Sequence, residues 1–105
     1  MENDPFFGQL QDIAKQFRIL SDPMRLLILH SLRHGELSVS EIVKLTGSSQ
    51  PNISKHLAIL HDNHLLNRRK EGTSVYFSIS APIIFKLCEM VCNRQNGSDA
   101  APPLQ

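Results

Sequence analysis

Hydrophobic side chains recur at helical spacing through most of this chain and at alternate positions through one short stretch. Over residues 8–20 the apolar positions fall three or four residues apart, as on one face of an amphipathic helix; they are Leu10, Ile13, Phe17 and Leu20. Residues 23–34 are apolar on nearly all sides, which predicts a helix in the core. Asp22 as N-cap, Pro23 at the first helical position and Gly35 just beyond the end support these limits.

Two shorter helices are predicted next, with only a few residues around Gly47 between them. The sequence Ser-Val-Ser-Glu at 38–41 has the form of a capping box, and the helix that it begins is predicted to end at Gly47. Ser48 and Ser49 can cap the following helix, where Pro51 in the first turn loses no hydrogen bond. The inward face of that helix is predicted to be Ile53, Leu57, Leu60 and His64. Two helices joined so closely have the spacing of a helix-turn-helix.

The hydrophobic period changes to two after Leu65. The alternating apolar positions are Val75, Phe77 and Ile79. A basic run at 67–70 precedes a turn, so we expect one two-stranded β-hairpin with a basic arm and Gly72 at its tip. Residues 81–94 return to helical spacing, and residues 95–105 have the Gly, Ser and Pro content of a flexible C-terminal tail.

The order of these elements predicts a mainly α, winged helix-turn-helix fold with about five helices and one β-hairpin. A chain of 105 residues, 41% hydrophobic and 20% charged, is typical of one soluble globular domain, which we place at residues 1–94. No apolar run approaches the roughly 18 residues of a membrane span, and the acidic N-terminus is unlike a signal peptide. We therefore expect a cytoplasmic protein.

The net charge is only +1, but the region from Lys55 to Lys70 is locally basic. In a winged helix-turn-helix the front of the fourth predicted helix enters the DNA major groove, where Gln and Asn suit adenine and free N–H groups suit phosphate. The base or phosphate contacts expected from this helix are Ser48, Ser49, Gln50, Asn52, Ser54, Lys55 and His56. Of these, His56 is expected nearer the flank, where it could position the helix or touch the DNA backbone. The hairpin is expected to follow the sugar-phosphate backbone through Arg68, Arg69, Lys70, Thr73 and Ser74. Taken singly, each feature also suits an ordinary helix start or a solvated turn.

The stretch ELSVSEIVKLTGSSQPNISKHLAILHDNHLLNRRKEGTSVYFSIS resembles the ArsR/SmtB family of bacterial transcriptional repressors. The family pattern runs close to S-Q-x-x-[VI]-S-x-H-L-x-x-L, then R-[RK]-x-G and a hairpin ending in aromatic residues. The matching positions are Ser49, Gln50, Ile53, Ser54, His56, Leu57, Leu60, Arg68, Gly72, Tyr76 and Phe77. The resemblance covers roughly residues 15–92. It implies a homodimer joined through the first and last helices, which binds a palindromic operator and releases it when an inducer binds.

The sequence lacks the ligands of the two metal sites that are typical of this family. Metal-sensing members usually carry Cys-x-Cys at the start of the third helix, where this chain has Ser38 and Ser40, and hydroxyls are poor ligands for soft ions. Other members hold zinc with Asp and His on the last helix, but residues 80–94 contain neither. We therefore predict neither of these metal sites.

Cys88 and Cys92, four positions apart, leave two interpretations open. The two thiols could share a soft metal or metalloid, meet those of a second subunit, or be oxidised. Alternatively they are small buried hydrophobes, since Cys88 lies between Ile84 and Val91 on one stripe. Apart from such an ion, we expect no cofactor, and no catalytic constellation indicates an enzyme. The remaining alternatives are a regulator of the same type without a sensor site and a winged-helix protein-interaction module.

Overall fold

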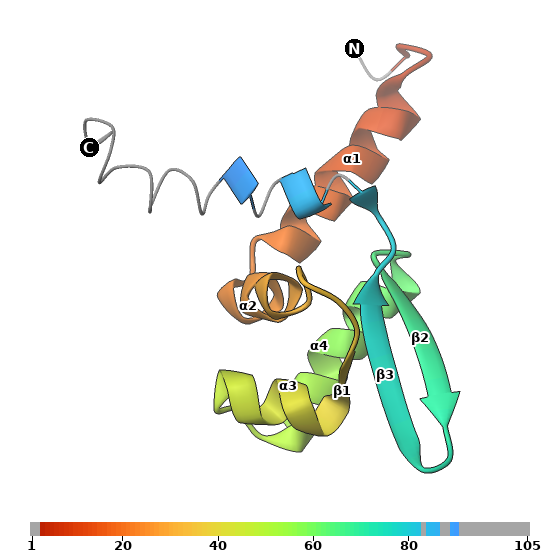
Figure 1. Ribbon diagram of the computed structural model, residues 1–105. Helices are drawn as coiled ribbons and strands as arrows, with labels where there is room; N and C mark the ends of the chain where they lie inside the picture. Colours follow the sequence, from red (N-terminus) through yellow and green to blue (C-terminus); the bar gives the residue numbers. More distant parts are fainter. Residues whose placement is uncertain (1–2, 83, 87–88, 91–105) are drawn as a thin grey trace, which may run out of the picture.

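The computed structural model describes residues 3–82, 84–86 and 89–90. Its helices and strands in chain order are α1 (Phe7–Leu20), α2 (Pro23–Ser31), β1 (Leu37–Ser38), α3 (Val39–Thr46), α4 (Gln50–Asp62), β2 (Leu66–Glu71) and β3 (Ser74–Ile79). Figure 1 shows α2, α3 and α4 grouped together, with the β2–β3 hairpin beside them and α1 running away from the group. Within the predicted helix at 81–94, the described residues 82, 84–86 and 89–90 are helical. The rest of that helix and the tail at 95–105 lie outside the described residues.

Helix α2 begins where the sequence predicts but ends earlier. The Asp22 carboxylate accepts hydrogen bonds from the backbone N–H groups of Met24 (2.8 Å) and Arg25 (3.3 Å), which confirms the N-cap. The helix ends at Ser31 rather than residue 34, because the chain tightens at Leu32, whose N–H is shared between the carbonyls of the third and fourth preceding residues.

The apolar surface of α2 is only partly covered. Ile28 and Leu29 are buried, whereas Leu26 and Leu27 are 46% and 39% exposed. The prediction that this helix belongs to the core is confirmed along the side with Ile28 and Leu29, while the side with Leu26 and Leu27 is exposed in the single chain.

The helix-turn-helix is formed by α3 and α4, as predicted. The capping box is complete, because Ser38 Oγ accepts from the Glu41 N–H (3.2 Å) and Glu41 Oε1 accepts from the Ser38 N–H (2.8 Å). Gly47 ends α3 in the left-handed conformation with φ of 72°, a geometry that favours glycine. The Ser49 hydroxyl then caps α4 by accepting from the backbone N–H of Asn52 at 3.3 Å.

His64 was predicted on the inward face of α4, and this is wrong. The helix ends at Asp62, and His64 follows it as an exposed residue with a positive φ of 64°. The chain turns at this point so that the N–H of Leu65 bonds the carbonyl of Leu60 at 3.0 Å, and Leu65 enters the core in place of His64.

The sheet has three strands in the order β1-β3-β2, rather than the two that were predicted. Strand β1 pairs antiparallel with β3, with Leu37 opposite Phe77 and Ser38 opposite Tyr76. It comprises only two residues, so it is too short to show an alternating pattern in the sequence. The β2–β3 hairpin turns at Gly72, whose φ of 62° confirms the predicted tip.

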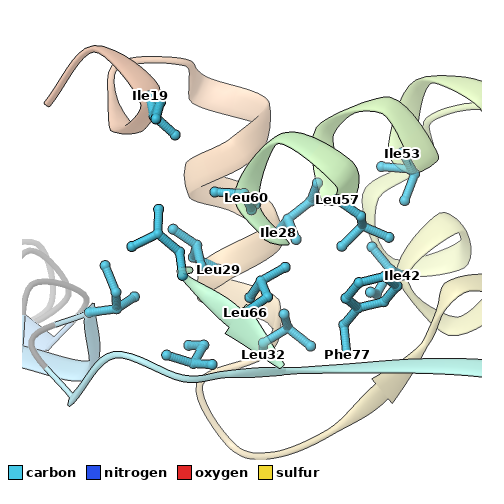
Figure 2. Close-up of a cluster of buried hydrophobic side chains, with 13 residues drawn as sticks. Ile19, Ile28, Leu29, Leu32, Ile42, Ile53, Leu57, Leu60, Leu66 and Phe77 are labelled. Atoms are coloured by element: carbon cyan, nitrogen blue, oxygen red, sulfur yellow. The ribbon is translucent and has the colours of Figure 1, made fainter. Parts of the chain in front are cut away.

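One hydrophobic core joins the helices to the sheet (Figure 2). Its buried side chains are Ile19, Ile28, Leu29, Leu32, Ile42, Ile53, Leu57, Leu60, Leu65, Leu66, Phe77, Ile79 and Ile84. Burial of each large apolar side chain contributes about 1.5–3 kcal/mol, so this cluster fixes α4 relative to α2, α3 and the sheet.

Helix α1 presents much of its apolar face to solvent in the single chain. Leu10, Ile13 and Phe17 are 55%, 50% and 67% exposed, and Phe6 just before the helix is also exposed. Only the end of α1 joins the core, through Ile19. No helix in the described part of the chain is long and apolar enough to cross a membrane.

Candidate nucleic-acid interface

The outer face of α4 is polar, and no other element covers it in the part of the chain that the structure describes. Ile53, Leu57 and Leu60 are buried, whereas Gln50, Ser54 and Lys55 are exposed. Lys55 lies about 200° around the helix from Ile53 and is turned away from the core, while Gln50 and Ser54 lie beside Leu57 on the flank that faces the wing. Three residues predicted to contact DNA are therefore placed together at the exposed N-terminal end of α4.

Other residues predicted at this end have partners within the protein. The side-chain amide of Asn52 donates to Ser48 Oγ at 2.8 Å, and both residues are half-buried. The Ser49 hydroxyl is engaged as the N-cap of α4. These three side chains therefore stabilise the start of the helix, and a base contact by Asn52 would have to replace its bond to Ser48.

His56 lies on the buried side of α4 rather than at its flank, where it was expected either to position the helix or to touch the DNA backbone. Its side chain is 6% exposed, and within the described residues Nδ1 has no hydrogen-bond partner. A step of three from Ile53 and of four to Leu60 turns His56 inward, so direct contact with DNA is not supported. Burial lowers the pKa of its imidazole, Asp22 opposes this effect, and Arg25 and Lys55 add to it.

We define the wing as residues 66–79. Its basic side chains are divided between the two faces of the sheet. Arg68 and Lys70 lie opposite Phe77 and Val75, on the face that Leu66 directs to the core. Arg69, one residue away from each, lies opposite Tyr76 on the other face. The three cations that the sequence predicts along the DNA backbone therefore do not form one surface.

Two hollows lie beside the N-terminal end of α4. One, of about 320 Å³, separates α4 from the wing and is lined by residues that include Gln50, Ser54, His61 and Arg68. The other, of about 390 Å³, lies between α3 and the tip of the wing; its polar lining residues include Ser38, Ser40, Lys44, Gln50, Thr73 and Ser74. The structure therefore brings the predicted wing residues Arg68, Thr73 and Ser74 next to Gln50.

Ser40 and Lys44 were missed by the sequence prediction. Both lie on α3 and line the second hollow with the predicted contact residues. Their signal in the sequence was their spacing of four on the exposed side of an apolar helix, which places them on one face.

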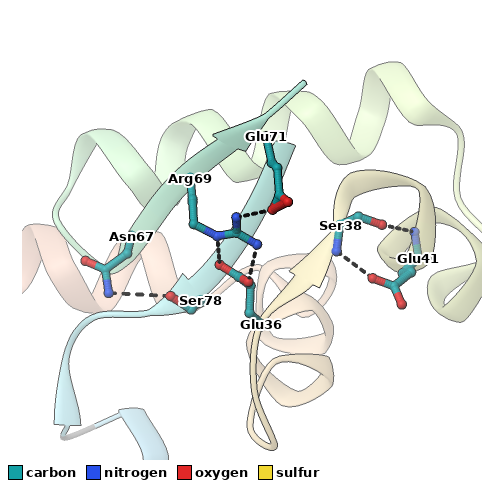
Figure 3. A network of polar contacts seen from close by, with 7 residues as sticks. All are labelled: Glu36, Ser38, Glu41, Asn67, Arg69, Glu71 and Ser78. Carbon is teal, nitrogen blue, oxygen red and sulfur yellow. Dashed lines mark hydrogen bonds and ion pairs between the residues drawn. The ribbon is translucent and has the colours of Figure 1, made fainter. Parts of the chain in front are cut away.

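Arg69 is held on the outer face of the wing by two carboxylates (Figure 3). Its Nε and Nη2 donate to the two oxygens of Glu36 at 2.9 and 2.8 Å, and its Nη1 donates to Glu71. Its guanidinium carbon lies 4.5 Å from the centroid of the Tyr76 ring. The hydrogen bond from Arg69 lowers the pKa of Glu36, and the two carboxylates raise the pKa of Arg69.

The predicted thiol pair, Cys88 and Cys92, lies outside the described residues. Among the residues that are described, no three or more His, Cys, Asp or Glu side chains gather closely enough to hold a metal ion.

Comparisons with known proteins agree on one family. A family model for "Bacterial regulatory protein, arsR family" matches residues 22–68. The HTH-type transcriptional regulator KmtR of Mycobacterium tuberculosis is 30% identical over 91 residues, covering 86% of this chain and 70% of that protein. The chain belongs to the ArsR family. The predicted family and winged helix-turn-helix fold are therefore confirmed, and the chain is a DNA-binding transcriptional repressor of this family.

Two further relatives extend this comparison. The arsenical resistance operon repressor of Escherichia coli is 43% identical over 68 residues, which cover 64% of this chain and 58% of that repressor. The solution structure of Mb0332 from Mycobacterium bovis superimposes with a TM-score of 0.75 at 28% identity, covering 97% of this chain and 92% of that one. It is described as a homodimeric winged helix-turn-helix DNA-binding domain. KmtR and the Escherichia coli repressor are named as transcriptional regulators and Mb0332 as a possible one, and none of them indicates an enzymatic family.

Proposed function

We propose that two copies of this ArsR-family chain bind a roughly palindromic operator and repress transcription from it. The observation that carries the proposal is the exposed polar end of α4 beside the wing, where Gln50 and Arg68 line one hollow. The N-terminal ends of recognition helices enter the major groove in helix-turn-helix proteins, and a symmetric dimer reads symmetric half-sites.

The proposed contacts fall into two groups. Gln50 and Ser54, beside the wing, face the bases, and Lys55, exposed farther around α4, lies near the phosphates. The wing supplies Arg68, Lys70, Thr73 and Ser74, and α3 supplies Ser40 and Lys44, for contacts to the sugar-phosphate backbone. The N-terminal end of α4 adds a favourable dipole for an anion.

The exposed apolar face of α1 supports the dimer. Leu10, Ile13 and Phe17 together leave an apolar stripe in solvent, which is unfavourable for an isolated chain. We propose that the stripe packs against the second subunit, together with the last helix. The homodimeric state described for the Mycobacterium bovis relative agrees with this arrangement.

Fluorescence anisotropy with a duplex from the chain's own promoter tests the proposal. We expect saturable binding that weakens steeply with salt, with a log-log slope of about −5 if a dimer neutralises about six phosphates. A duplex of the same composition in scrambled order is the control and should bind more weakly. Equal binding to both duplexes, or binding that does not respond to salt, would contradict sequence-specific recognition and favour a protein-interaction module.

We further propose that a thiol-reactive signal at Cys88 and Cys92, the only two cysteines of the chain, releases the operator. Thiolates are the ligands that soft metals and metalloids prefer, and the relative from Escherichia coli is named as an arsenical resistance repressor. Operator binding should be measured with arsenite, cadmium, a sulfide donor and an oxidant, for wild type and for Cys88→Ser and Cys92→Ser. Release in wild type and not in the variants supports the proposal. An equal response in all three proteins, or none, would contradict it and favour a regulator without a thiol sensor.

A further inference from the structure

We propose that Arg69 and Glu36 form a brace that sets the position of the wing for DNA binding, so that Arg69 is a positioning residue and not a phosphate contact. The inference rests on the proposed DNA-binding function. It concerns the outer face of the wing, opposite to the hollow that contains Arg68.

The contact between the two residues is specific in geometry. Nε and Nη2 of Arg69 donate side by side to the two oxygens of Glu36 at 2.9 and 2.8 Å, which is a bidentate pair. The partners are 33 positions apart, so the pair joins two separate segments of the chain. Such a planar arrangement requires a guanidinium, because a lysine ammonium cannot form it.

The brace crosses the whole sheet. Arg69 starts on β2, lies directly opposite Tyr76 of β3 and stacks over its ring at 4.5 Å. Its guanidinium then reaches Glu36, the residue before β1. Since the sheet order is β1-β3-β2, this single side chain connects the outermost strand to the segment that leads into α3.

This connection matters because the rest of the wing is weakly held. An isolated two-stranded hairpin is at best marginally stable in water. The third strand of the sheet, β1, adds only two paired residues to it. The core anchors the base of the hairpin through Leu66, Phe77 and Ile79, whereas residues 67–74 are exposed. The brace holds the exposed part of β2 at a fixed angle to the helix-turn-helix.

The charges around Arg69 argue against a phosphate contact. Two carboxylates, from Glu36 and Glu71, face one guanidinium, so the local net charge is negative. A phosphate would have to displace Glu36 and give up the bidentate pair. Arg68 and Lys70, on the opposite face, have no ion pair to give up among the described contacts. They remain the wing cations that neutralise DNA.

Glu36→Gln distinguishes the brace from the alternative that Glu36 only repels the DNA phosphates. Removal of an acid near bound DNA should tighten binding if Glu36 only repels phosphates. If it braces the wing, the variant should bind the operator about two- to fivefold more weakly, the range expected for losing one exposed ion pair, with an unchanged salt slope. Glu71→Gln is the matched control, because it removes a carboxylate from the same arginine but within one strand; it should stay within about twofold of wild type.

Two variants of Arg69 complete the test. Arg69→Lys keeps the charge but loses the bidentate geometry, so the brace predicts weaker binding similar to that of Glu36→Gln. The double variant Glu36→Arg with Arg69→Glu restores a pair of reversed polarity and should recover part of the affinity lost in Arg69→Glu alone. The proposal is overturned if Glu36→Gln binds more tightly than wild type and Arg69→Lys binds normally.

A measurement on the free protein distinguishes the brace from the DNA-binding proposal. Amide hydrogen exchange at residues 70–75 should be several-fold faster in Glu36→Gln than in wild type, since the wing opens more often. If exchange is faster in Glu36→Gln but the wild-type protein binds no operator, the proposed function is contradicted while the structural role of the brace still holds. Unchanged exchange together with unchanged operator affinity would overturn the brace alone.

Discussion

Arg68 of β2 lies directly opposite Phe77 of β3, on the face of the sheet that turns toward α4. Phe77 is buried and packs edge-to-face with His61 of α4, with ring centroids 6.4 Å apart. This pairing sets the side chain of Arg68 at the boundary between the wing and α4. A cation at that position can approach a phosphate while α4 occupies the major groove.

Arg68→Ala should therefore weaken binding to operator and scrambled duplexes by a similar factor. The loss of one phosphate contact should reduce the magnitude of the salt slope by about 1 per subunit. Anisotropy titrations at several salt concentrations measure the slope. Lys15→Ala on α1 is a matched control that removes a cation away from the proposed interface, and it should leave the slope unchanged.

Gln50→Ala should change which sequence is bound rather than how strongly DNA is bound in general. An amide that reads one base pair contributes about 1–3 kcal/mol of discrimination, so the preference for the operator over a variant at that pair should fall. Titrations against a set of single-base-pair operator variants identify the position. A uniform loss across every duplex, scrambled ones included, would show that Gln50 contacts only the backbone.

Phe17→Glu should convert the dimer to a monomer. Phe17 is 67% exposed in the single chain, and a carboxylate in the proposed apolar interface would be desolvated without a partner. Light scattering coupled to size-exclusion chromatography measures the mass of each species. Lys15→Glu, on the polar side of the same helix, is the control and should remain dimeric; a dimeric Phe17→Glu would exclude this face from the interface.

The buried imidazole of His56 predicts a loss of stability on acidification. Burial lowers its pKa below the ordinary value of 6.5, so the unfolded chain takes up the proton first as the pH falls. The contribution of His56 is therefore fully present above pH 6.5 and decreases below it. We expect Tm to fall between pH 7.5 and 5.5.

His56→Gln tests the source of that loss, because glutamine is polar and does not titrate. The variant should be less sensitive to pH over the same interval, even if its Tm is lower throughout. Identical pH profiles for wild type and His56→Gln would assign the effect to other groups.

Ser38→Ala should destabilise the domain through loss of the α3 cap. The hydroxyl of Ser38 accepts the N–H of Glu41, and removal of an N-cap side chain costs about 1 kcal/mol. Urea denaturation followed by circular dichroism measures the free energy of unfolding. Ser38→Thr retains a capping hydroxyl and should recover most of the stability.

Helix limits could be predicted from the sequence because their signals are local. The Asp22 cap, the capping box at 38–41 and Gly47 each act within one turn, and all three are present. The end of α2 could not be predicted as well, since the change to a tighter turn at Leu32 depends on hydrogen bonds rather than on residue type.

The sequence prediction of the candidate site differs from the structure for two reasons. Some contacts are long-range, and residue type was given more weight than position in the helical or strand period. The spacing from Ile53 turns His56 inward, although its imidazole suggests a surface contact. The separation of Arg68 from Arg69 follows from the period of a strand. The pairing of Arg69 with Glu36 could not be predicted from that period, because it depends on how β1 joins the sheet.

Ser38 belongs to two structures at once. It pairs with Tyr76 as the last residue of β1, and it caps α3 as the residue before that helix. No linker separates β1 from the helix-turn-helix at this point, so β1 and the start of α3 move together, and the Arg69–Glu36 pair extends this connection to the exposed part of the wing. Each subunit would then dock on a duplex as one rigid unit, and any adjustment to half-sites of unequal spacing would take place between the subunits.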